Sequence, residues 1–393
     1  MAKHIRALML CDYYLPGYKA GGVVRSVVNM VEQLSDAIDS SIITRDRDIG
    51  NDIAYENICV DQWNAMGPAR VFYLSNGWRS LLRLRYLIRD TPCDVIYLNS
   101  LFSLRFAILP LLMRRLGFVP RRPFILAPRG ELSLGALAIK SHRKRLYLRT
   151  ARMIGLLSEG LWQASTPLEE EDIRRWFPNA QVQVAQDIPG KAPVLLNARD
   201  TKLPGELKVI FLSRISYKKN LDGALRMLAG VHGHIRFDIY GPKEDPVYWK
   251  DCEELIKRLP GNIEVRYRGT VNHEEVNGIF SRAHLFLFPT HGENHGHVIH
   301  ESLLAGCPVL ISDQTPWRNL TRLGIGWDLS LLHPRAFGDA LQHCVDLDEE
   351  AFLELSRAAR KYGLTSGVDD DVKKKNMLLF SQAVAASAGD KHA

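Results

Sequence analysis

The sequence predicts an α/β protein made of two doubly wound domains, each with a parallel sheet and helices on both faces. Apolar segments of strand length alternate with longer segments of helical period along most of the chain. The length of 393 residues exceeds what one core usually holds, which favours two or three domains. Residues 187–206, which are rich in Pro and Gly, interrupt this alternation of strand and helix patterns once, and their composition predicts a linker.

The first alternating series leads us to assign residues 1–195 to an N-terminal domain. Gly21 and Gly22 precede its first helical pattern, Val23–Leu34, and Thr166 followed by Pro167 predicts another helix start, with a cap and Pro at the first position. The expected strands are Ile5–Leu10, Ser41–Thr44, Val71–Leu74, Val95–Leu98, Phe124–Ala127 and Leu161–Ser165.

The second series leads us to assign residues 196–368 to a C-terminal domain, followed by a terminal helix over Asp369–Ala386. In such sheets ligands bind at the carboxyl ends of the strands, and two facing domains would place those ends around one cleft. The expected strands are Lys208–Leu212, Arg236–Tyr240, Ile263–Tyr267, His284–Phe288 and Pro308–Ser312, and the expected helices are Asn220–Val231, Pro246–Leu259, His273–Ser281 and His297–Ala305.

The composition, with 46% hydrophobic and 24% charged residues, is typical of a globular protein and excludes a wholly disordered or fibrous chain. The net charge of +7 is uneven, because residues 1–200 hold 27 basic and 19 acidic residues whereas residues 201–393 hold 24 and 25. Within the basic half, residues 79–152 hold 16 basic and 3 acidic residues. This excess indicates an anionic partner, which could be nucleic acid, a membrane surface or a phosphorylated substrate.

The six cysteines form no Cys-x-x-Cys pair, which argues against a zinc ribbon or a thioredoxin-type motif and fits a reducing compartment. The apolar run Ala7–Cys11 is too short for the core of a signal peptide. The stretch Leu101–Phe118 is interrupted by three arginines and a proline, and falls short of the ~20 apolar residues of a membrane span. We expect a cytoplasmic protein, with peripheral contact to the inner face of the plasma membrane left open.

The segment from Leu287 to Ser312 carries the strongest functional signal. Glu293 lies in a polar loop after an expected strand, and Glu301 lies eight residues later, just over one turn into a helix. The free amides at the start of that helix attract an anion such as phosphate, and flanking carboxylates can accept hydrogen bonds from sugar hydroxyls. The alternative is that Glu293 is a capping acid and Glu301 a solvated helix charge. The loop, the helix and the strand that follows Gly306 together favour a binding site.

A second segment pairs two cations on a loop between strand and helix. Arg214 and Lys219 are five residues apart, and two such cations can clamp a diphosphate and neutralise a leaving nucleotide. Lys218 takes the place of Lys219 if the register shifts by one residue. On their own, an Arg and two Lys on a loop fit a solvated surface better than a binding site.

Together these segments resemble the signature of family-4 retaining glycosyltransferases, which have the GT-B fold. The resemblance rests on the Glu-x7-Glu pair followed by Gly306, Pro308 and Val309, and on the Arg214–Lys219 loop. It spans nearly the full length and is strongest over residues 205–320. The sequence departs from the pattern at Leu304, where Ala is usual, at Ser213 and Asn220, where Gly is common, and at His295, where an apolar residue is common.

The resemblance implies a fold of two Rossmann-like domains facing across a cleft, with the terminal segment 369–393 packing back on the N-terminal domain. It implies that Glu293, Arg214 and Lys219 are catalytic, with Glu293 close to the donor sugar. Further donor-binding residues would be Glu301, which would hold the ribose hydroxyls, and Asn294, His295, Gly296, His297, Val298, Gly21, Gly22, Gly241 and Val271. The co-substrate would be a nucleotide-diphosphate sugar, with UDP and GDP not distinguished. We expect no cofactor and no metal, because fixed cations would do the metal's work.

On the acceptor side, Pro128-Arg129-Gly130 marks a recognisable subset of this family. Arg129 would bind an acceptor phosphate or the donor, or would only pair with Glu131. The other acceptor-binding candidates are Arg25, Lys140, Arg143 and Lys144. The last three begin a basic amphipathic stretch, 140–152, that suits anionic lipid headgroups. A solvated helix face is the alternative there, and the absence of a nucleic-acid-binding motif argues against a nucleic-acid partner.

Two decoys are set aside. His291, His295, His297 and His300 cluster in sequence but lack the spacing of a zinc site. Asp46-Arg47-Asp48 mimics the metal motif of the other glycosyltransferase fold, and we interpret its acids as loop or cap residues.

The expected function is retaining transfer of a hexose-type sugar from a nucleotide-diphosphate donor. The acceptor would be a glycan or a polyprenyl-pyrophosphate-linked glycan, in the assembly of a bacterial capsule, O-antigen or exopolysaccharide. The alternatives are a nucleotide-sugar epimerase or hydrolase on the same fold, and a non-catalytic module that binds nucleotide sugars.

Overall fold

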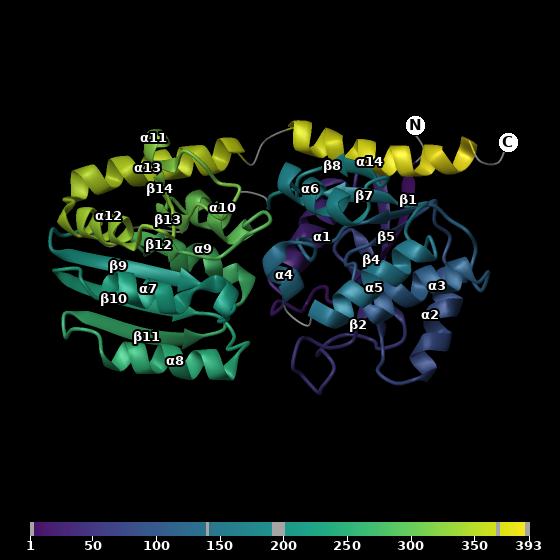
Figure 1. Ribbon diagram of the computed structural model, residues 1–393, viewed down its shortest axis with the longest axis horizontal. Coiled ribbons are helices and arrows are strands. Elements are labelled where there is room, and N and C mark those ends of the chain that lie inside the picture. The colour runs from purple at the N-terminus through teal and green to yellow at the C-terminus, as the bar shows by residue number, and fades with distance from the viewer. Residues whose placement is uncertain (1–3, 139–140, 191–200, 367–369, 390–393) are drawn as a thin grey trace. The chain divides into compact units, whose positions relative to one another are not determined.

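The computed structural model describes residues 4–138, 141–190, 201–366 and 370–389, and divides the chain into two compact units. Unit 1 comprises Met1–Ile188 and Asp370–Ala393, and unit 2 comprises Pro189–Asp369 (Figure 1). The boundary that the sequence predicts between residues 195 and 196 lies outside the described residues. Each unit holds its own parallel sheet, as predicted.

The sheet of unit 1 has eight strands in the order β3-β4-β2-β1-β5-β6-β7-β8. All neighbouring strands are parallel except the antiparallel pair β3 and β4 at one edge. The strands are β1 (Ile5–Leu10), β2 (Ile38–Arg45), β3 (Trp63–Met66), β4 (Ala69–Leu74), β5 (Val95–Leu98), β6 (Phe124–Leu126), β7 (Leu161–Ala164) and β8 (Gln181–Val184).

Helices cover both faces of this sheet. Since successive side chains of a strand point to opposite faces, each strand contributes to two separate cores. On one face Met9 of β1 shares a core with Val27 of α1 (Gly22–Gln33) and Phe380 of α14 (Asp370–Gly389). On the other face Leu8 and Leu10 share a core with the remaining helices. These are α2 (Arg79–Asp90), the π-helical turn η1 (Leu104–Ile108), α3 (Leu109–Arg115), α4 (Leu134–Ala138), α5 (Ser141–Met153) and α6 (Pro167–Trp176).

The terminal helix α14 is part of unit 1, as expected for this fold class. The ring of Phe380 stacks on Tyr97 of β5 with centroids 5.7 Å apart. Asn376 Nδ2 donates to the carbonyl oxygen of Gln186 at 2.8 Å, and Gln163 Nε2 donates to Asn376 Oδ1 at 3.4 Å. Apolar and polar contacts therefore fix the end of the chain to the first unit.

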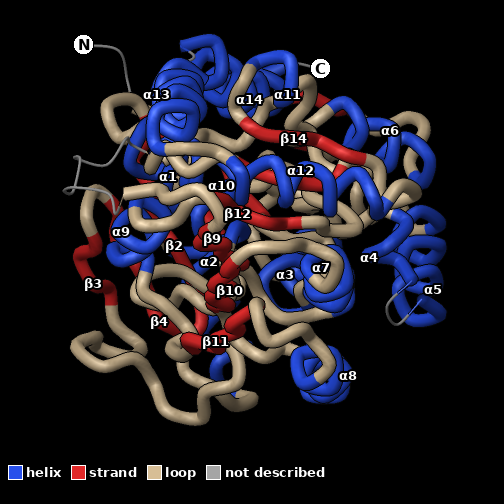
Figure 2. Tube along the Cα trace, turned by 90° about the vertical axis from the view of Figure 1, so that its left-hand side faces the viewer, coloured by secondary structure: helices blue, strands red, loops and turns tan. Residues whose placement is uncertain are grey.

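The sheet of unit 2 has six parallel strands in the order β11-β10-β9-β12-β13-β14. The strands are β9 (Glu206–Leu212), β10 (His234–Tyr240), β11 (Ile263–Gly269), β12 (Leu285–Phe288), β13 (Val309–Ser312) and β14 (Gly326–Leu329). The helices are η2 (Tyr217–Lys219), α7 (Leu221–Leu228), α8 (Pro246–Lys257), α9 (His273–Ser281), α10 (His297–Leu304), α11 (Leu320–Leu323), α12 (Pro334–Asp346) and α13 (Glu349–Ser366). Figure 2 looks along β9, β10 and β11, with α9 on one side and α7 and α8 on the other.

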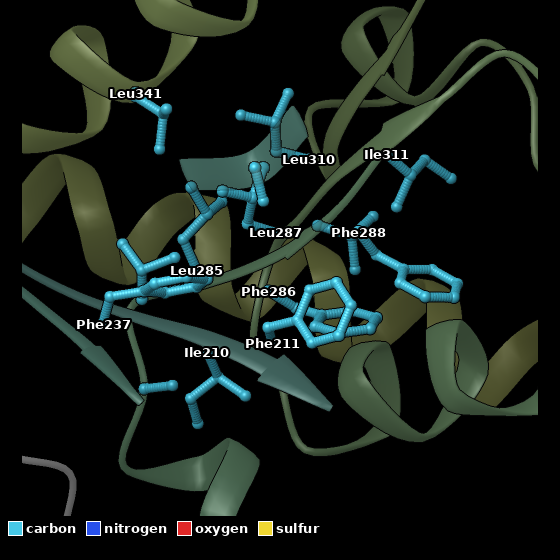
Figure 3. Packing of buried hydrophobic residues seen from close by; sticks show 14 of the residues in the cluster. Ile210, Phe211, Phe237, Leu285, Phe286, Leu287, Phe288, Leu310, Ile311 and Leu341 are labelled. Carbon is cyan, nitrogen blue, oxygen red and sulfur yellow. The ribbon is translucent and has the colours of Figure 1, made fainter. Parts of the chain in front are cut away.

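The core of unit 2 centres on β12, whose four residues are all buried. Figure 3 shows Phe286 and Phe288 of this strand close to Phe211 of β9. A strand that is apolar on both faces is typical of a central position between two helical layers. This packing holds the ends of β9 and β12 next to each other, where the site is built.

Candidate functional site

Lys219 and Glu293, two of the predicted catalytic residues, form an ion pair in unit 2. Lys219 ends η2 in the loop after β9, and Glu293 lies in the loop after β12. Lys219 Nζ donates to Glu293 Oε1, and the two side chains are 11% and 15% exposed. Because β9 and β12 are neighbouring parallel strands, their carboxyl ends bring these residues together from 74 positions apart.

Hydrogen bonds between the two loops hold this pair in place. The amide of His291 donates to the carbonyl oxygen of Lys218 at 2.8 Å, and Asn220 Nδ2 donates to the carbonyl oxygen of Pro289 at 2.7 Å. Asn220 has a left-handed backbone with φ of 58°, and its side chain caps α7 at the amide of Gly223. Asn is one of the few residues that adopt this conformation readily, which explains why it stands where the family commonly has Gly.

Lys218, the alternative cation, is half-buried beside the pair. Burial lowers its pKa, the Glu293 carboxylate partly offsets this, and the charges of Lys219 and Arg214 lower it further. The ion pair to Glu293 is made by Lys219, so the geometry favours the original register.

Arg214 lies in the same loop and pairs with a residue that the sequence analysis missed. Arg214 Nη1 lies 2.7 Å from Glu244 Oε1, with the two side chains 35% and 42% exposed. Glu244 follows β10, and the amide of Ile215 donates to the carbonyl oxygen of Pro242 at 2.8 Å, which joins the two loops. A single Glu after a turn gives no signal in the sequence.

The amino terminus of α10 follows directly on the Glu293 loop. Its N-cap residue is Gly296, with φ of 78°, so no side chain of the N-cap residue covers the helix start. The first turn of α10, as the structure describes it, contains no acidic residue. Trp317 Nε1 donates to the carbonyl oxygen of His295 at 2.7 Å, and a Cβ added to Gly296 would lie 2.9 Å from Ile299 Cδ1. The loop is therefore hydrogen-bonded to Trp317, a second residue that the sequence analysis missed. The amides of His297 and Val298 belong to this helix start, which suits an anion.

The histidines near this loop have different surroundings. The rings of His295 and His297 lie 4.5 Å apart between centroids. His300 Nε2 donates to the carbonyl oxygen of Gly363 in α13 at 2.9 Å, and burial lowers the pKa of His300 to about 4. His300 therefore serves packing between α10 and α13. Over the described ranges of the chain, no three His, Cys, Asp or Glu side chains are grouped to hold a metal ion.

The remaining donor-side candidates of unit 2 lie at helix starts and strand ends. Glu301 Oε1 lies 3.6 Å from Nδ1 of His273, the first residue of α9. Gly241 directly follows β10 and has φ of 132°, and a Cβ there would fall 1.8 Å from the carbonyl oxygen of Ser213, so only Gly fits. Asn294 is half-buried in the Glu293 loop, and Val271, after β11, packs partly buried on the core.

In unit 1, Gly21 and Gly22 form the start of α1, with Gly21 as an N-cap at φ of 64°. The preceding loop is held by Asp48, whose Oδ2 accepts the amides of Tyr18 and Lys19 at 2.9 and 3.1 Å. Asp46 pairs with the neighbouring Arg47. The acids of the Asp46-Arg47-Asp48 motif thus act as loop residues, as interpreted from the sequence.

Arg129 is an interior residue. Its side chain is 5% exposed, and its guanidinium contacts Asp187, Asn99 Oδ1 at 2.8 Å and the Tyr97 hydroxyl. Burial disfavours its charged form, but the charge of Asp187 and other neighbours outweighs this and raises the pKa of Arg129. The alternative in which Arg129 pairs with Glu131 is wrong, because that carboxylate instead accepts hydrogen bonds from the Ser100 hydroxyl and from backbone amides. A guanidinium engaged in this way is a poor candidate for acceptor binding.

The other acceptor-side candidates differ in exposure. Arg143 on α5 is exposed and Arg25 on α1 is half-exposed. Lys144 contacts other residues of unit 1. Its Nζ donates to the carbonyl oxygen of Ala136 at 2.6 Å and lies 5.1 Å from the Phe102 ring centroid. Lys140 lies outside the described residues. In the part of the chain that the structure describes, no helix is both long and apolar enough to cross a bilayer.

Comparison with known families adds to this geometry. Residues 197–325 match the family described as "Glycosyl transferases group 1". The matched residues lie within unit 2, Pro189–Asp369. Arg214, Lys219, Glu293 and Glu301 all lie within the matched residues.

Two curated relatives match parts of the chain. The 2-deoxystreptamine N-acetyl-D-glucosaminyltransferase of Niallia circulans is 31% identical over 113 residues, 28% of each chain. The phosphatidylinositol N-acetylglucosaminyltransferase gpi3 subunit of Schizosaccharomyces pombe is 26% identical over 107 residues, 26% of this chain and 23% of that protein. The chain thus matches about a quarter of the length of these relatives.

Solved structures with the same fold cover nearly the whole chain. Sucrose-phosphate synthase from Thermosynechococcus elongatus superposes with a TM-score of 0.69 at 17% identity, covering 98% of this chain and all of that one. Anabaena HepE in complex with UDP-glucose gives a TM-score of 0.67 at 15% identity, covering 97% of this chain and all of HepE. The likeness to these structures shows that the two α/β units have the GT-B fold.

Proposed function

We propose that the protein transfers a hexose-type sugar from a nucleotide-diphosphate donor to a glycan or lipid-linked acceptor, with retention of the anomeric configuration. The Lys219–Glu293 ion pair carries this proposal, because it places a cation and a carboxylate at the carboxyl ends of two neighbouring strands. Arg214 lies in the same loop as Lys219, and the start of α10 follows Glu293 by a few residues. A diphosphate and a sugar need this combination of cations, helix amides and a carboxylate.

On the donor side, Lys219, Arg214 and the amides of α10 would neutralise the diphosphate as it leaves. The donor phosphate would compete with Glu293 for Lys219, and with Glu244 for Arg214. Binding of the donor would thereby free the Glu293 carboxylate to accept hydrogen bonds from the sugar hydroxyls. Glu301, one turn further along α10, would accept from the ribose hydroxyls.

In the transfer step, the bond between the anomeric carbon and the phosphate oxygen breaks while the acceptor oxygen attacks from the same face. The acceptor's proton passes to the departing phosphate oxygen, and the sugar carries oxocarbenium character between the two events. The sugar keeps its configuration because bond breaking and bond making share one face. The fixed cations supply the charge neutralisation, so the proposal includes neither a metal ion nor a resident cofactor.

The comparisons support a choice of donors to test first. The two curated relatives are named as N-acetylglucosaminyltransferases, and HepE was solved with UDP-glucose. UDP-N-acetylglucosamine and UDP-glucose are therefore the first donors to test, with GDP sugars as the alternative. We propose a glycan on polyprenyl pyrophosphate as acceptor, in the assembly of a bacterial surface polysaccharide at the cytoplasmic side of the membrane. Arg25 and Arg143 remain acceptor-binding candidates.

The test is a mass-spectrometric transfer assay with each donor, with and without glycan and lipid-linked acceptors. We expect a product that contains the donor sugar only when an acceptor is present, and loss of that product in Glu293→Gln at unchanged thermal stability. Free sugar or an epimer formed from donor alone would favour a hydrolase or epimerase. Donor binding without turnover on any acceptor would favour a binding module. Full activity of Glu293→Gln would contradict the site assignment.

A further inference from the structure

The outward sides of α2, α3 and α5 form one surface of unit 1. Leu84 of α2, Leu111 of α3 and Leu148 of α5 belong to the same core on one face of the sheet. The opposite side of each helix therefore faces away from that core, and Figure 1 shows the three helices in unit 1. This surface, called the Arg-aromatic face below, consists of Trp78, Arg79, Leu82, Arg83, Tyr86, Arg89, Arg115, Leu116, Phe118, Arg121, Arg143, Arg145, Leu146, Arg149, Arg152 and Met153.

A row of large apolar side chains runs along α2. Trp78, Leu82 and Tyr86 are four residues apart and are 70%, 51% and 50% exposed. This spacing places them on the same side of the helix, whereas Leu84 and Ile88 point into the core and are almost fully buried. Exposed apolar residues that gather in this way usually mark a surface that another apolar phase covers.

Arginines lie against the rings of this row and extend it to the next helix. The guanidinium carbon of Arg79 lies 5.4 Å from the centroid of the Trp78 ring, and that of Arg89 lies 4.8 Å from the Tyr86 ring. Arg85 Nε donates to the carbonyl oxygen of Phe118, after α3, at 3.1 Å. Phe118 is itself 50% exposed, so the apolar row continues from α2 to the loop after α3.

The same pattern recurs on α5. Leu146 and Met153, two helical turns apart, are 67% and 80% exposed. Arg145, Arg149 and Arg152 are exposed beside them. Three helices that share one face of the sheet thus present the same mixture of apolar side chains and arginines.

The charge of this part of the chain is strongly one-sided. Of the 3 acidic residues among residues 79–152, Asp94 pairs with Arg6 and Asp90 pairs with Arg89. The third, Glu131, is bound to Ser100 and to backbone amides. Acids outside this stretch pair with two of its 16 basic residues, Arg83 with Asp61 and Arg114 with Glu159, and Arg129 is buried. The arginines that remain exposed on the Arg-aromatic face still outnumber its acids; they include Arg79, Arg115, Arg121, Arg143, Arg145, Arg149 and Arg152.

A bilayer with anionic lipids matches both properties at once. Trp and Tyr favour the boundary between headgroups and acyl chains, and arginines bind lipid phosphates while their stems lie along apolar atoms. A nucleic acid would match the arginines but would leave Leu82, Leu146 and Met153 without an apolar partner. We propose that the Arg-aromatic face docks on an anionic phospholipid bilayer, with Trp78, Leu82, Tyr86, Leu146 and Met153 entering the headgroup layer and the arginines binding lipid phosphates.

The test is co-sedimentation of the purified full-length protein with vesicles, which needs no catalysis and is independent of the transfer reaction. We expect binding to vesicles of phosphatidylcholine with 30 mol% phosphatidylglycerol, weaker binding at high salt, and little binding to pure phosphatidylcholine. Brominated lipids should quench part of the tryptophan fluorescence, and Trp78→Phe should remove that part.

Two sets of variants locate the surface. Arg145→Ser with Arg149→Ser should lower the partition coefficient roughly thirtyfold, because each basic residue near an anionic surface contributes about one kcal/mol. Trp78→Ser with Leu82→Ser should lower it at least as much. The matched control is Val247→Ser with Leu332→Ser, which removes two exposed apolar side chains of unit 2 and should bind as wild type.

Several outcomes would overturn the proposal. Equal binding to vesicles with and without phosphatidylglycerol would do so, as would wild-type binding by both sets of unit 1 variants. Binding to single-stranded RNA or to an acidic protein without binding to vesicles would assign the face to another partner. The substitutions are at exposed positions, and thermal unfolding of each variant separates a loss of docking from a loss of folding.

Discussion

Both units place a cation just after a strand, but the two cations have different surroundings. Lys219 of unit 2 pairs with Glu293, and both side chains lie on loops and keep 11% and 15% of their surface exposed. Arg129 of unit 1 follows β6 and pairs with Asp187, and these side chains are only 5% and 4% exposed. Asp187 also accepts hydrogen bonds from the buried hydroxyls of Ser26 and Ser165.

The difference shows which cation can exchange its partner. Under the proposed function, the donor phosphate would displace Glu293 from Lys219, and both side chains keep some contact with water. Displacing Asp187 would leave a buried carboxylate without its countercharge, which is strongly unfavourable. Position after a strand therefore brings a cation to the right end of the sheet, but the partner's burial decides whether it can serve a ligand.

The largest effect is expected from breaking the buried pair of unit 1. Arg129→Ala should lower the free energy of unfolding by about 3–5 kcal/mol, because Asp187 loses its countercharge in the interior. Chemical denaturation followed by circular dichroism measures this. If the Arg129→Ala protein has wild-type stability and fails only to bind acceptor, then Arg129 is a binding residue and the proposed difference between the two units is wrong.

The pair of unit 2 should show the opposite behaviour. Lys219→Ala should lower kcat for sugar transfer by about 10²–10³, the cost of removing one electrostatic stabiliser, with little change in the unfolding midpoint. Lys218→Ala is the matched control and should retain most of the activity. If Lys218→Ala is the inactive variant, the register of the loop is shifted by one residue.

A pH titration tests burial within unit 2. The unfolded chain protonates His300 near its ordinary pKa of 6.5, whereas burial lowers the folded value to about 4. The contribution of neutral His300 to the free energy of unfolding should therefore be fully present above pH 6.5. It should fall by at most roughly 3 kcal/mol as the pH drops towards 4, and should not change further below pH 4. His300→Gln should remove most of this fall in urea unfolding series. Identical pH profiles for the two proteins would show that His300 does not titrate in this way.

The smallest effect is expected at the more exposed pair of unit 2. Glu244→Gln should change the free energy of unfolding by less than about 0.5 kcal/mol, because exposed ion pairs contribute little. By freeing Arg214 from a competing carboxylate, it should lower the donor KM slightly. A loss of more than about 2 kcal/mol would mean that the pair is structural, like that of Arg129.

The central parts of the fold were predictable, and its edges were not. Central strands such as β1, β5 and β12 are short apolar runs buried on both faces, so their residues stand out in the sequence. The strands absent from the prediction, β3, β8 and β14, are all at the edge of a sheet. An edge strand such as Gln181–Val184 is only partly buried and carries too few apolar residues to be recognised.

The candidate site divides in a similar way. Glu293, Lys219 and Arg214 could be proposed because they follow expected strands and match motifs of the family that the sequence resembles. Their neighbours Glu244, Trp317 and His273 could not, since each joins the site through tertiary contacts from another loop or helix. The burial of Arg129 could not be predicted either, because its partner Asp187 lies 58 residues away in the sequence.

Calorimetric titration of nucleoside diphosphates tests the central assignment most directly, since it measures donor-side binding without requiring the acceptor. We expect UDP or GDP to bind wild type, and Lys219→Ala to bind it roughly ten- to a hundredfold more weakly, as loss of a charge-assisted contact implies. Arg129→Lys should bind it as wild type does under conditions where it is folded. Wild-type affinity in Lys219→Ala, together with lost affinity in folded Arg129→Lys, would contradict the account.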